Sequence, residues 1–207
     1  LVNVIYGQNV FLTASLAILA FANLYSRPML AGTLIGCLVI KPQMAVLLPL
    51  LLICGKHWQA FLAAAITAIL MCLLSTWSIG LDAWPAFFQS LSDAREYLEA
   101  GKLRWSQMIS VFANVKQLAG STTLAYSLHI AWAGMLLALS VFTWLRTRDL
   151  ALRATTFVLA TLHFSPYMYD YELVWMALPL TLLSIRGSQS GWLRFERELL
   201  LIAWLFP

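Results

Sequence analysis

The sequence predicts an all-α fold: a polytopic transmembrane helical bundle with short re-entrant V-shaped helix pairs and a long extracytoplasmic loop. Of its 207 residues, 61% are hydrophobic and only 11% are charged, whereas a soluble domain carries about 25% charged residues. The long apolar runs lack the alternation typical of strands, and only helices or closed barrels satisfy the backbone inside a bilayer. This composition excludes soluble enzymes, disordered chains and secreted disulfide scaffolds.

Six apolar segments follow one another along the chain, and we treat residues 1–207 as a single integral-membrane domain. They span residues 10–25, 29–40, 43–54, 58–79, 122–145 and 154–185, the last interrupted at 165–172. A helix needs about 20 apolar residues to cross the hydrocarbon core. The chain starts with Leu1, and residues 199–207 begin another apolar run that is cut short. We therefore expect a piece of a longer protein, inactive on its own.

Segments 29–40 and 43–54 allow two interpretations. Each holds about 12 residues, or roughly 18 Å of helix, which is too short to cross alone. Joined as one span, they would place Lys41 near the bilayer centre, at a cost of at least ~2.5–3.5 kcal/mol. As a V with Lys41 and Pro42 at its tip they avoid this cost, because Pro42 disfavours helix at the preceding residue.

The positive-inside rule favours the V over the single span. With a V, all short basic loops fall on one side of the membrane. These loops contain Arg27, Lys56, residues 146–153 and residues 186–198. With a single span, the two arginine-rich loops would lie outside. The last apolar region must then also be two helices that meet at the outer face, around residues 165–172.

Four features collect at the predicted extracytoplasmic face. They are residues 6–9, Lys41 with Pro42, the loop 80–121, and residues 169–172. The loop 80–121 has balanced charges and several aromatic residues, which is typical of helices lying in the membrane interface.

Lys41 is the only cation within the predicted V. Phosphate binds lysine as a point charge, so Lys41 is a candidate ligand for a phosphate or pyrophosphate group. The alternative is a lysine that snorkels from a helix end to the headgroups.

Asp170 and Glu172 lie between two apolar half-helices and beside Tyr169 and Tyr171. Ionisable residues at such positions are usually functional or paired. A carboxylate here could act as a general base, bind a metal or accept a hydrogen bond from a sugar hydroxyl, while the tyrosines could stack on a sugar ring. The alternative is an interfacial loop with an aromatic belt. On a helix the two carboxylates would diverge by about 200°, since residues repeat every 3.6, so we do not expect them to act as one pair.

Weaker candidates surround these residues. Gln8 and Asn9 could line the cavity or cap the first helix, since Asn is a favoured N-cap. Arg104 and Trp105 could contact an acceptor or anchor the long loop at the interface. His163 is the histidine nearest the predicted site, and no histidine pair has metal-ligand spacing. We expect no metal and no cofactor, and the sequence contains no P-loop, GxSxG or dinucleotide fingerprint.

An ordered set of motifs gives the chain a family resemblance. The motifs are Tyr6-Gly7-Gln8-Asn9, Ala31-Gly32-Thr33-Leu34-Ile35-Gly36, Ile40-Lys41-Pro42-Gln43, and Ser165-Pro166-Tyr167 through Tyr171-Glu172. In this order and spacing the chain resembles glycosyltransferase family 87, also catalogued as domain of unknown function family 2029.

The resemblance implies a membrane glycosyltransferase of the C superfamily. Such enzymes transfer a hexose, typically mannose, from a polyprenyl-phosphate carrier to a lipid or glycan acceptor, with inversion, at the extracytoplasmic face of the bacterial inner membrane. In this family's pattern the main catalytic carboxylate lies in the first extracytoplasmic loop, upstream of the present chain, and other members carry histidines where this chain has Tyr171 and Glu172. We expect Lys41 to bind the carrier phosphate and no nucleic acid to be a partner. The alternative function is a non-catalytic transporter or flippase of lipid-linked glycans.

Overall fold

A computed structural model describes residues 8–205, and every regular element in that range is helical. This confirms the predicted all-α class. Tyr6 and Gly7 of the first motif lie outside the described residues. The first half contains α2 (Val10–Asn23), α3 (Pro28–Cys37), η1 (Leu38–Ile40), α4 (Pro42–Ala45), α5 (Leu48–Cys54) and α6 (Trp58–Ile79). The second half contains α7 (Ala83–Glu99), η2 (Trp105–Gln107), α8 (Val111–Ala119), α9 (Thr122–Arg146), α10 (Leu150–Phe164), η3 (Asp170–Met176), α11 (Ala177–Ser190) and α12 (Glu196–Leu205).

The chain reverses direction at Lys41. This residue has a non-helical backbone, with φ −143° and ψ 72°, and a following proline disfavours the helical conformation. The chain then returns, so that Tyr25, ahead of α3, and His57, after α5, both lie within hydrogen-bond distance of Arg153. Residues 43–54 do not form the single helix that we expected. They divide into α4 and α5 because the ring of Pro49 clashes with the carbonyl four residues earlier and its nitrogen offers no donor.

Two of the described helices are long and apolar enough to cross a membrane, namely α6 with 22 residues and α9 with 25. Both leave large apolar side chains uncovered on their outer faces, such as Trp77 on α6 and Leu145 on α9. In water such faces would be costly, so they fit an apolar solvent.

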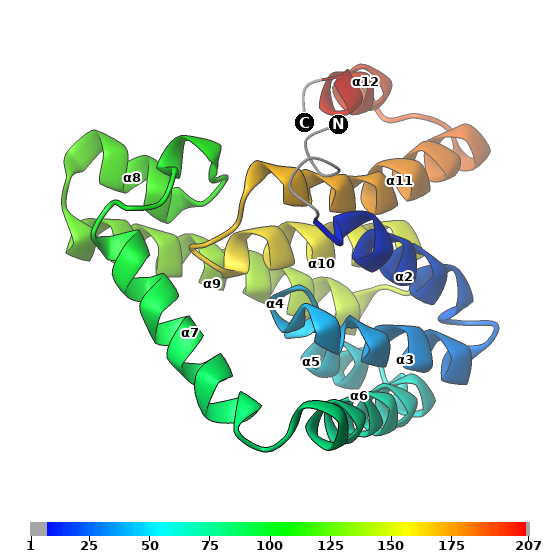
Figure 1. Cartoon of the computed structure of the whole chain (residues 1–207). Helices are drawn as coiled ribbons and strands as arrows, with labels where there is room; N and C mark the ends of the chain where they lie inside the picture. The colour runs from blue at the N-terminus through cyan, green and yellow to red at the C-terminus, as the bar shows by residue number, and fades with distance from the viewer. Residues whose placement is uncertain (1–7, 206–207) are drawn as a thin grey trace.

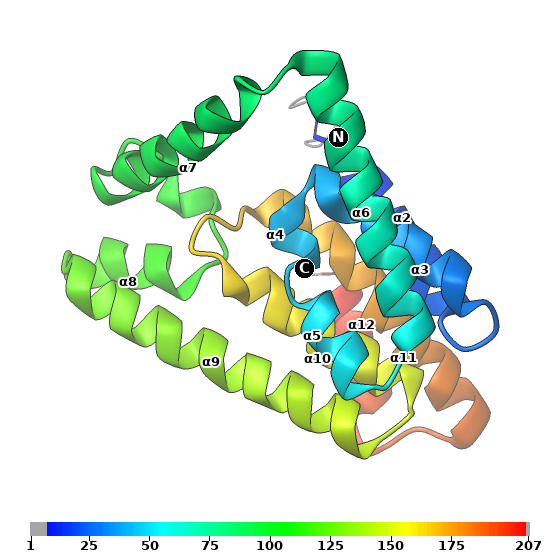
Figure 2. The ribbon, with the colours of Figure 1, turned by 90° about the horizontal axis from the view of Figure 1, so that it is seen from below.

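The main core lies where α2, α3, α5 and α10 pack together, with Phe21, Phe157, Trp144 and Trp175 among its fully buried side chains. Figure 1 shows α11 and α12 above this core and α6 below it. Seen from below, α6, α7 and α9 form three sides of a triangle around α4 and α5 (Figure 2). The helix α7 therefore links the far ends of the two long helices, and its Trp84 indole donates a hydrogen bond of 2.9 Å to Thr76 of α6.

Small residues allow α3 and α6 to approach closely. Gly32 and Gly36 form a GxxxG pattern on α3, which in membrane helices marks close backbone contact. A Cβ atom at Gly32 would lie 2.2 Å from the carbonyl oxygen of Ala60, and one at Gly36 would lie 2.6 Å from that of Ala64. The contact therefore depends on both glycines.

We predict that Gly36→Ala destabilises the protein by about 1–3 kcal/mol, the usual cost of overpacking, because α3 must move away from α6. The measurement is thermal unfolding in detergent, followed by tryptophan fluorescence. Gly134→Ala is the matched control, since it is also a glycine within a helix but has nothing within 4 Å of its added Cβ. Equal melting temperatures for the two variants would contradict the prediction.

Candidate functional site

An ion pair between Lys41 and Glu172 lies at the centre of the candidate site. Both residues are buried, with 8% and 2% of their surfaces exposed. They are 131 residues apart in the chain, so the turn before α4 and the start of η3 must come together for the pair to form. No local spacing in the sequence gives either charge a partner, and the structure pairs them with each other.

A break between two helices positions Glu172. The helix α10 ends at Phe164, two residues before Pro166, and the chain runs without regular helix until η3 begins at Asp170. This break lies within the predicted interruption at 165–172. The long loop holds this break in place. The Ile109 amide donates a hydrogen bond of 3.0 Å to the Met168 carbonyl, and Met108 and Tyr169 form an isolated antiparallel β-bridge.

Tyr171 lies beside the ion pair and stacks on Tyr169. The rings of Tyr169 and Tyr171 stack with centroids 5.5 Å apart and planes 6° apart. The Lys41 ammonium lies 5.4 Å from the Tyr171 ring centroid, within the range of a cation–π interaction. Burial and the neighbouring Glu172 carboxylate raise the pKa of Tyr171 to about 12, and burial also raises the pKa of Tyr169. Both hydroxyls therefore stay protonated near neutral pH and can donate hydrogen bonds.

The ion pair leaves hydrogen-bonding capacity unused. Lys41 Nζ carries three N–H donors, and within residues 8–205 the structure gives it one acceptor, Glu172 Oε1. Glu172 Oε2 is buried and has no partner among the described residues. A buried acceptor without a partner is costly, so the site is suited to a polar ligand. Asp170 is exposed, which agrees with the expectation that the two carboxylates do not act as one pair.

The weaker candidates lie around this centre. Gln8 is half-buried, and Asn9 is exposed at the N-cap of α2 without a side-chain capping bond. Arg104 is exposed, and its charge acts on Tyr169, whose pKa it lowers against the larger effect of burial. The Trp105 indole donates to the Leu98 carbonyl at 3.2 Å and packs in a small cluster within the long loop. No hydrogen bond, ion pair or cation–π contact in the described part of the chain joins these four residues to Lys41, and their roles in binding stay predictions.

His163 makes no hydrogen bond to the pair among the described residues. Its Nδ1 atom is 3.0 Å from the carbonyl of Leu159, and its ring lies beside Trp132. Among residues 8–205, no three His, Cys, Asp or Glu side chains gather in a way that could hold a metal ion.

An apolar pocket of about 450 Å³ opens beside the turn that carries Lys41. Its wall comes from η1, Pro42, the second half of α6 and the start of α7. The lining residues are Val39, Ile40, Pro42, Met71, Cys72, Ser75, Thr76, Gly80, Ala83, Trp84 and Phe87. The site thus combines a buried charge with an adjacent apolar surface, a combination that suits an amphipathic ligand.

Comparison with known proteins agrees with the sequence resemblance. The family model described as glycosyltransferase family 87 matches residues 1–166. The match includes Lys41 and the apolar pocket and ends before Asp170 and Glu172. No curated protein and no solved structure matches the chain.

We predict that Lys41→Met and Glu172→Leu each destabilise the protein by about 3–5 kcal/mol, because each leaves one buried charge without its partner. The double variant should regain most of this loss, since a buried ion pair replaced by apolar side chains is often neutral. Urea unfolding of the four proteins in one detergent measures the coupling. A double variant that loses the sum of the two single effects would show that the pair does not hold the site together.

Proposed function

Because the chain belongs to glycosyltransferase family 87, we propose that it transfers a hexose, typically mannose, from a polyprenyl-phosphate carrier to a hydroxyl group of a lipid or glycan acceptor. The family match supports a transferase over the non-catalytic transporter. The observation that carries the donor class is the buried Lys41 ammonium, which has unused N–H donors, on a turn whose flanking residues Ile40 and Pro42 line an apolar pocket.

Lys41 binds the phosphate of the donor in this proposal. An ammonium group neutralises the charge that develops on a phosphate leaving group, and such stabilisation is strongest in a site that excludes water. Glu172 and the Tyr171 ring hold the ammonium in place, so it need not reorganise during the reaction.

The isoprenoid chain occupies the apolar pocket beside Pro42. The pocket begins at the residues flanking Lys41 and continues along α6 towards Trp84 and Phe87. In this proposal a lipid whose phosphate lies at Lys41 places its first isoprene units on this surface.

The transfer is a single displacement at the anomeric carbon. The acceptor oxygen forms a bond to that carbon, the bond from the carbon to the phosphate oxygen breaks with its electron pair, and polyprenyl phosphate leaves. The hydroxyl proton must pass to a base. Glu172 is ion-paired with Lys41. The exposed Asp170 is therefore the carboxylate in this segment that an acceptor hydroxyl can reach. Tyr169 and Tyr171 can stack on the sugar, while Gln8, Asn9, Arg104 and Trp105 contact the rest of the substrates.

The reaction takes place at the extracytoplasmic face of the bacterial inner membrane. Tyr25, Lys56, His57 and Arg148 gather at one end of the bundle, and short basic loops face the cytoplasm under the positive-inside rule. Lys41 is carried by the turn between α3 and α4, away from these loops.

We predict that Lys41→Ala lowers transfer from a polyprenyl-phosphate hexose by roughly 100- to 1,000-fold, the usual loss when one donor to a developing anion is removed. The measurement is transfer of radiolabelled hexose in membranes that contain the full-length protein. Lys102→Ala is the control, because Lys102 is exposed in the long loop and lies over the Tyr97 ring, and this variant should keep full activity.

Loss of folding would also abolish activity, so the assay includes the double variant Lys41→Met/Glu172→Leu. This variant lacks the ammonium group but leaves no unpaired buried charge. We expect it to be folded and inactive. Wild-type transfer by the double variant would overturn the role of Lys41 in phosphate binding.

We predict that Ser75→Trp raises the KM for a long-chain polyprenyl-phosphate donor several-fold and leaves the KM for a short-chain analogue unchanged. The indole would fill the apolar pocket, which Ser75 lines, and a short chain does not extend into it. Leu70→Trp is the control, since Leu70 is on the same helix and 59% exposed. An unchanged KM for both donors in Ser75→Trp would place the isoprenoid chain elsewhere.

A further inference from the structure

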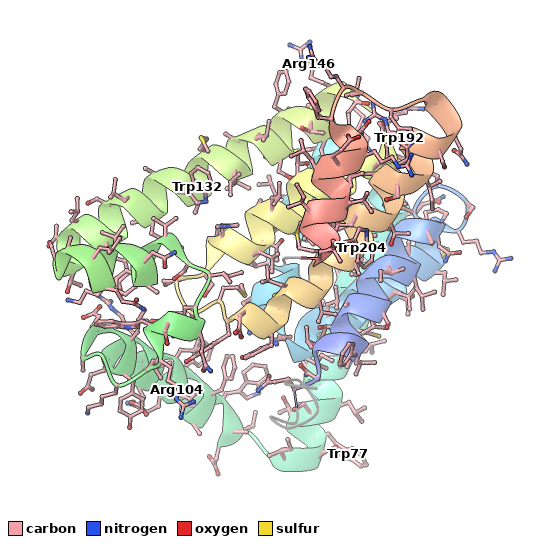
Figure 3. The ribbon with its side chains drawn as sticks, turned by 90° about the horizontal axis from the view of Figure 1, so that it is seen from above. Trp77, Arg104, Trp132, Arg146, Trp192 and Trp204 are labelled. Atoms are coloured by element: carbon pink, nitrogen blue, oxygen red, sulfur yellow. The ribbon has the colours of Figure 1, made fainter. Side chains whose placement is uncertain are left out.

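A second pocket, of about 470 Å³, lies at the other end of the bundle. Figure 3 shows Arg146 at this end, far from Arg104 and Trp77. The residues that line the pocket include Tyr25, Lys56, His57, Arg146, Arg148 and Arg153. They include four lysine or arginine side chains and no carboxylate. We call this site the Arg153 pocket.

Arg153 is a buried cation without a carboxylate partner. It is 4% exposed, and none of the ion pairs among the described residues includes it. Its guanidinium donates to the Thr147 carbonyl at 2.7 Å, the Trp144 carbonyl at 2.7 Å and the Tyr25 hydroxyl at 3.1 Å. It also lies 5.0 Å from the centroid of the Trp144 ring. These contacts hold the group in place, but all of its partners are neutral.

His57 adds no negative charge to this environment. Burial, followed by the charges of Arg153 and Arg148, lowers the pKa of His57 below its ordinary value, so the ring is neutral near pH 7. Its Nε2 atom lies 2.8 Å from Arg153 Nη1 and must accept, because a guanidinium has only donors. The nearest carboxylate in the sequence, Asp149, is bound to Arg186 at 3.1 Å. The charge of Arg153 thus remains uncompensated, and buried charges are normally paired.

The turn after α5 keeps a lysine where the backbone favours glycine. Lys56 has φ 58°, a left-handed conformation that costs free energy for any residue with a Cβ atom. The glycine of this turn stands one residue earlier. A Cβ atom at Gly55 would lie 2.9 Å from the Trp144 ring and 3.1 Å from Arg153 Nη1. Gly55 therefore makes room for the guanidinium, while Lys56 adds a charge to the pocket at a cost to the turn.

We propose that the Arg153 pocket binds a phosphate group. Arginine side chains match the geometry of phosphate oxygens, and basic pockets between membrane helices bind anionic headgroups. Arg153 provides a buried, fixed cation, and Lys56, Arg146 and Arg148 provide exposed cations around it. The phosphate belongs either to an anionic lipid headgroup or to a soluble phosphate compound. This site is separate from Lys41, and its occupancy does not depend on the proposed transferase reaction.

The test uses the full chain, freed of lipid, in a neutral detergent, with three probes: phosphatidylglycerol, phosphatidylcholine and inorganic pyrophosphate. Native mass spectrometry measures the Kd of each lipid, and the shift in melting temperature reports every probe. We expect phosphatidylglycerol to bind and stabilise the protein more than phosphatidylcholine, whose positive choline group offsets its phosphate. A larger shift with pyrophosphate than with phosphatidylglycerol identifies a soluble ligand and also supports the phosphate site.

The variants Lys56→Gly and Arg148→Gln remove exposed charges, so neither leaves a buried group unpaired. Each should weaken binding of the effective probe about fivefold, and the two together about 25-fold. Lys56→Gly should also raise the melting temperature of the unliganded protein, because glycine adopts the left-handed conformation freely. This opposite effect on stability and binding separates lost affinity from lost folding.

Arg194→Gln is the matched control. Arg194 is an exposed arginine in the loop before α12, over the Phe195 ring, and it does not line the pocket. Its removal should leave the Kd unchanged. Wild-type affinity in the Lys56→Gly/Arg148→Gln double variant would overturn the proposal, as would equal binding of phosphatidylglycerol and phosphatidylcholine with no shift from pyrophosphate.

Discussion

The ion pair between Lys41 and Glu172 constrains the whole fold. Each charge is buried in a chain with few polar residues, and an isolated buried charge costs several kcal/mol. The pair forms only if the turn before α4 and the break before η3 lie side by side. These two interruptions divide the apolar segments into antiparallel halves, and the indole of Trp175 in η3 donates to Thr13 of α2 at 3.2 Å. The local breaks and the tertiary arrangement therefore stabilise one another.

Most helices could be predicted from the sequence because long apolar runs and prolines determine them locally. The bounds of α6 match the predicted segment 58–79, and the turn at Lys41 follows from Pro42. The division between α4 and α5 also has a local signal, because Pro49 cannot continue a helix from α4. By contrast, the close approach of α3 to α6 depends on which face of each helix carries small residues, and the length of an apolar run does not contain that information.

The site could be predicted in part. Lys41 and Glu172 stood out as single charges in apolar surroundings, but their pairing joins residues far apart in the chain, which no local spacing encodes. A signal did exist, since opposite charges within membrane segments usually pair. Arg153 was harder to identify. By sequence it belongs to a basic loop, whereas the structure places it inside α10 and buries it against Trp144. Its contacts with Tyr25, His57 and Trp144, which come from separate segments, distinguish it from its exposed neighbours.

The buried cations at the two ends of the bundle have different partners. At Lys41 the protein supplies its own carboxylate, so the ion pair is neutral, and a phosphate bound as proposed would share the ammonium with Glu172. At Arg153 every protein partner is neutral, so the pocket keeps its charge until an anion enters. A shared cation suits a ligand that must leave after each turnover, because product release is faster when affinity is limited. An uncompensated cation suits a ligand that stays. This difference supports the two proposals, which assign donor binding during transfer to the paired lysine and long-lived anion binding to the unpaired arginine.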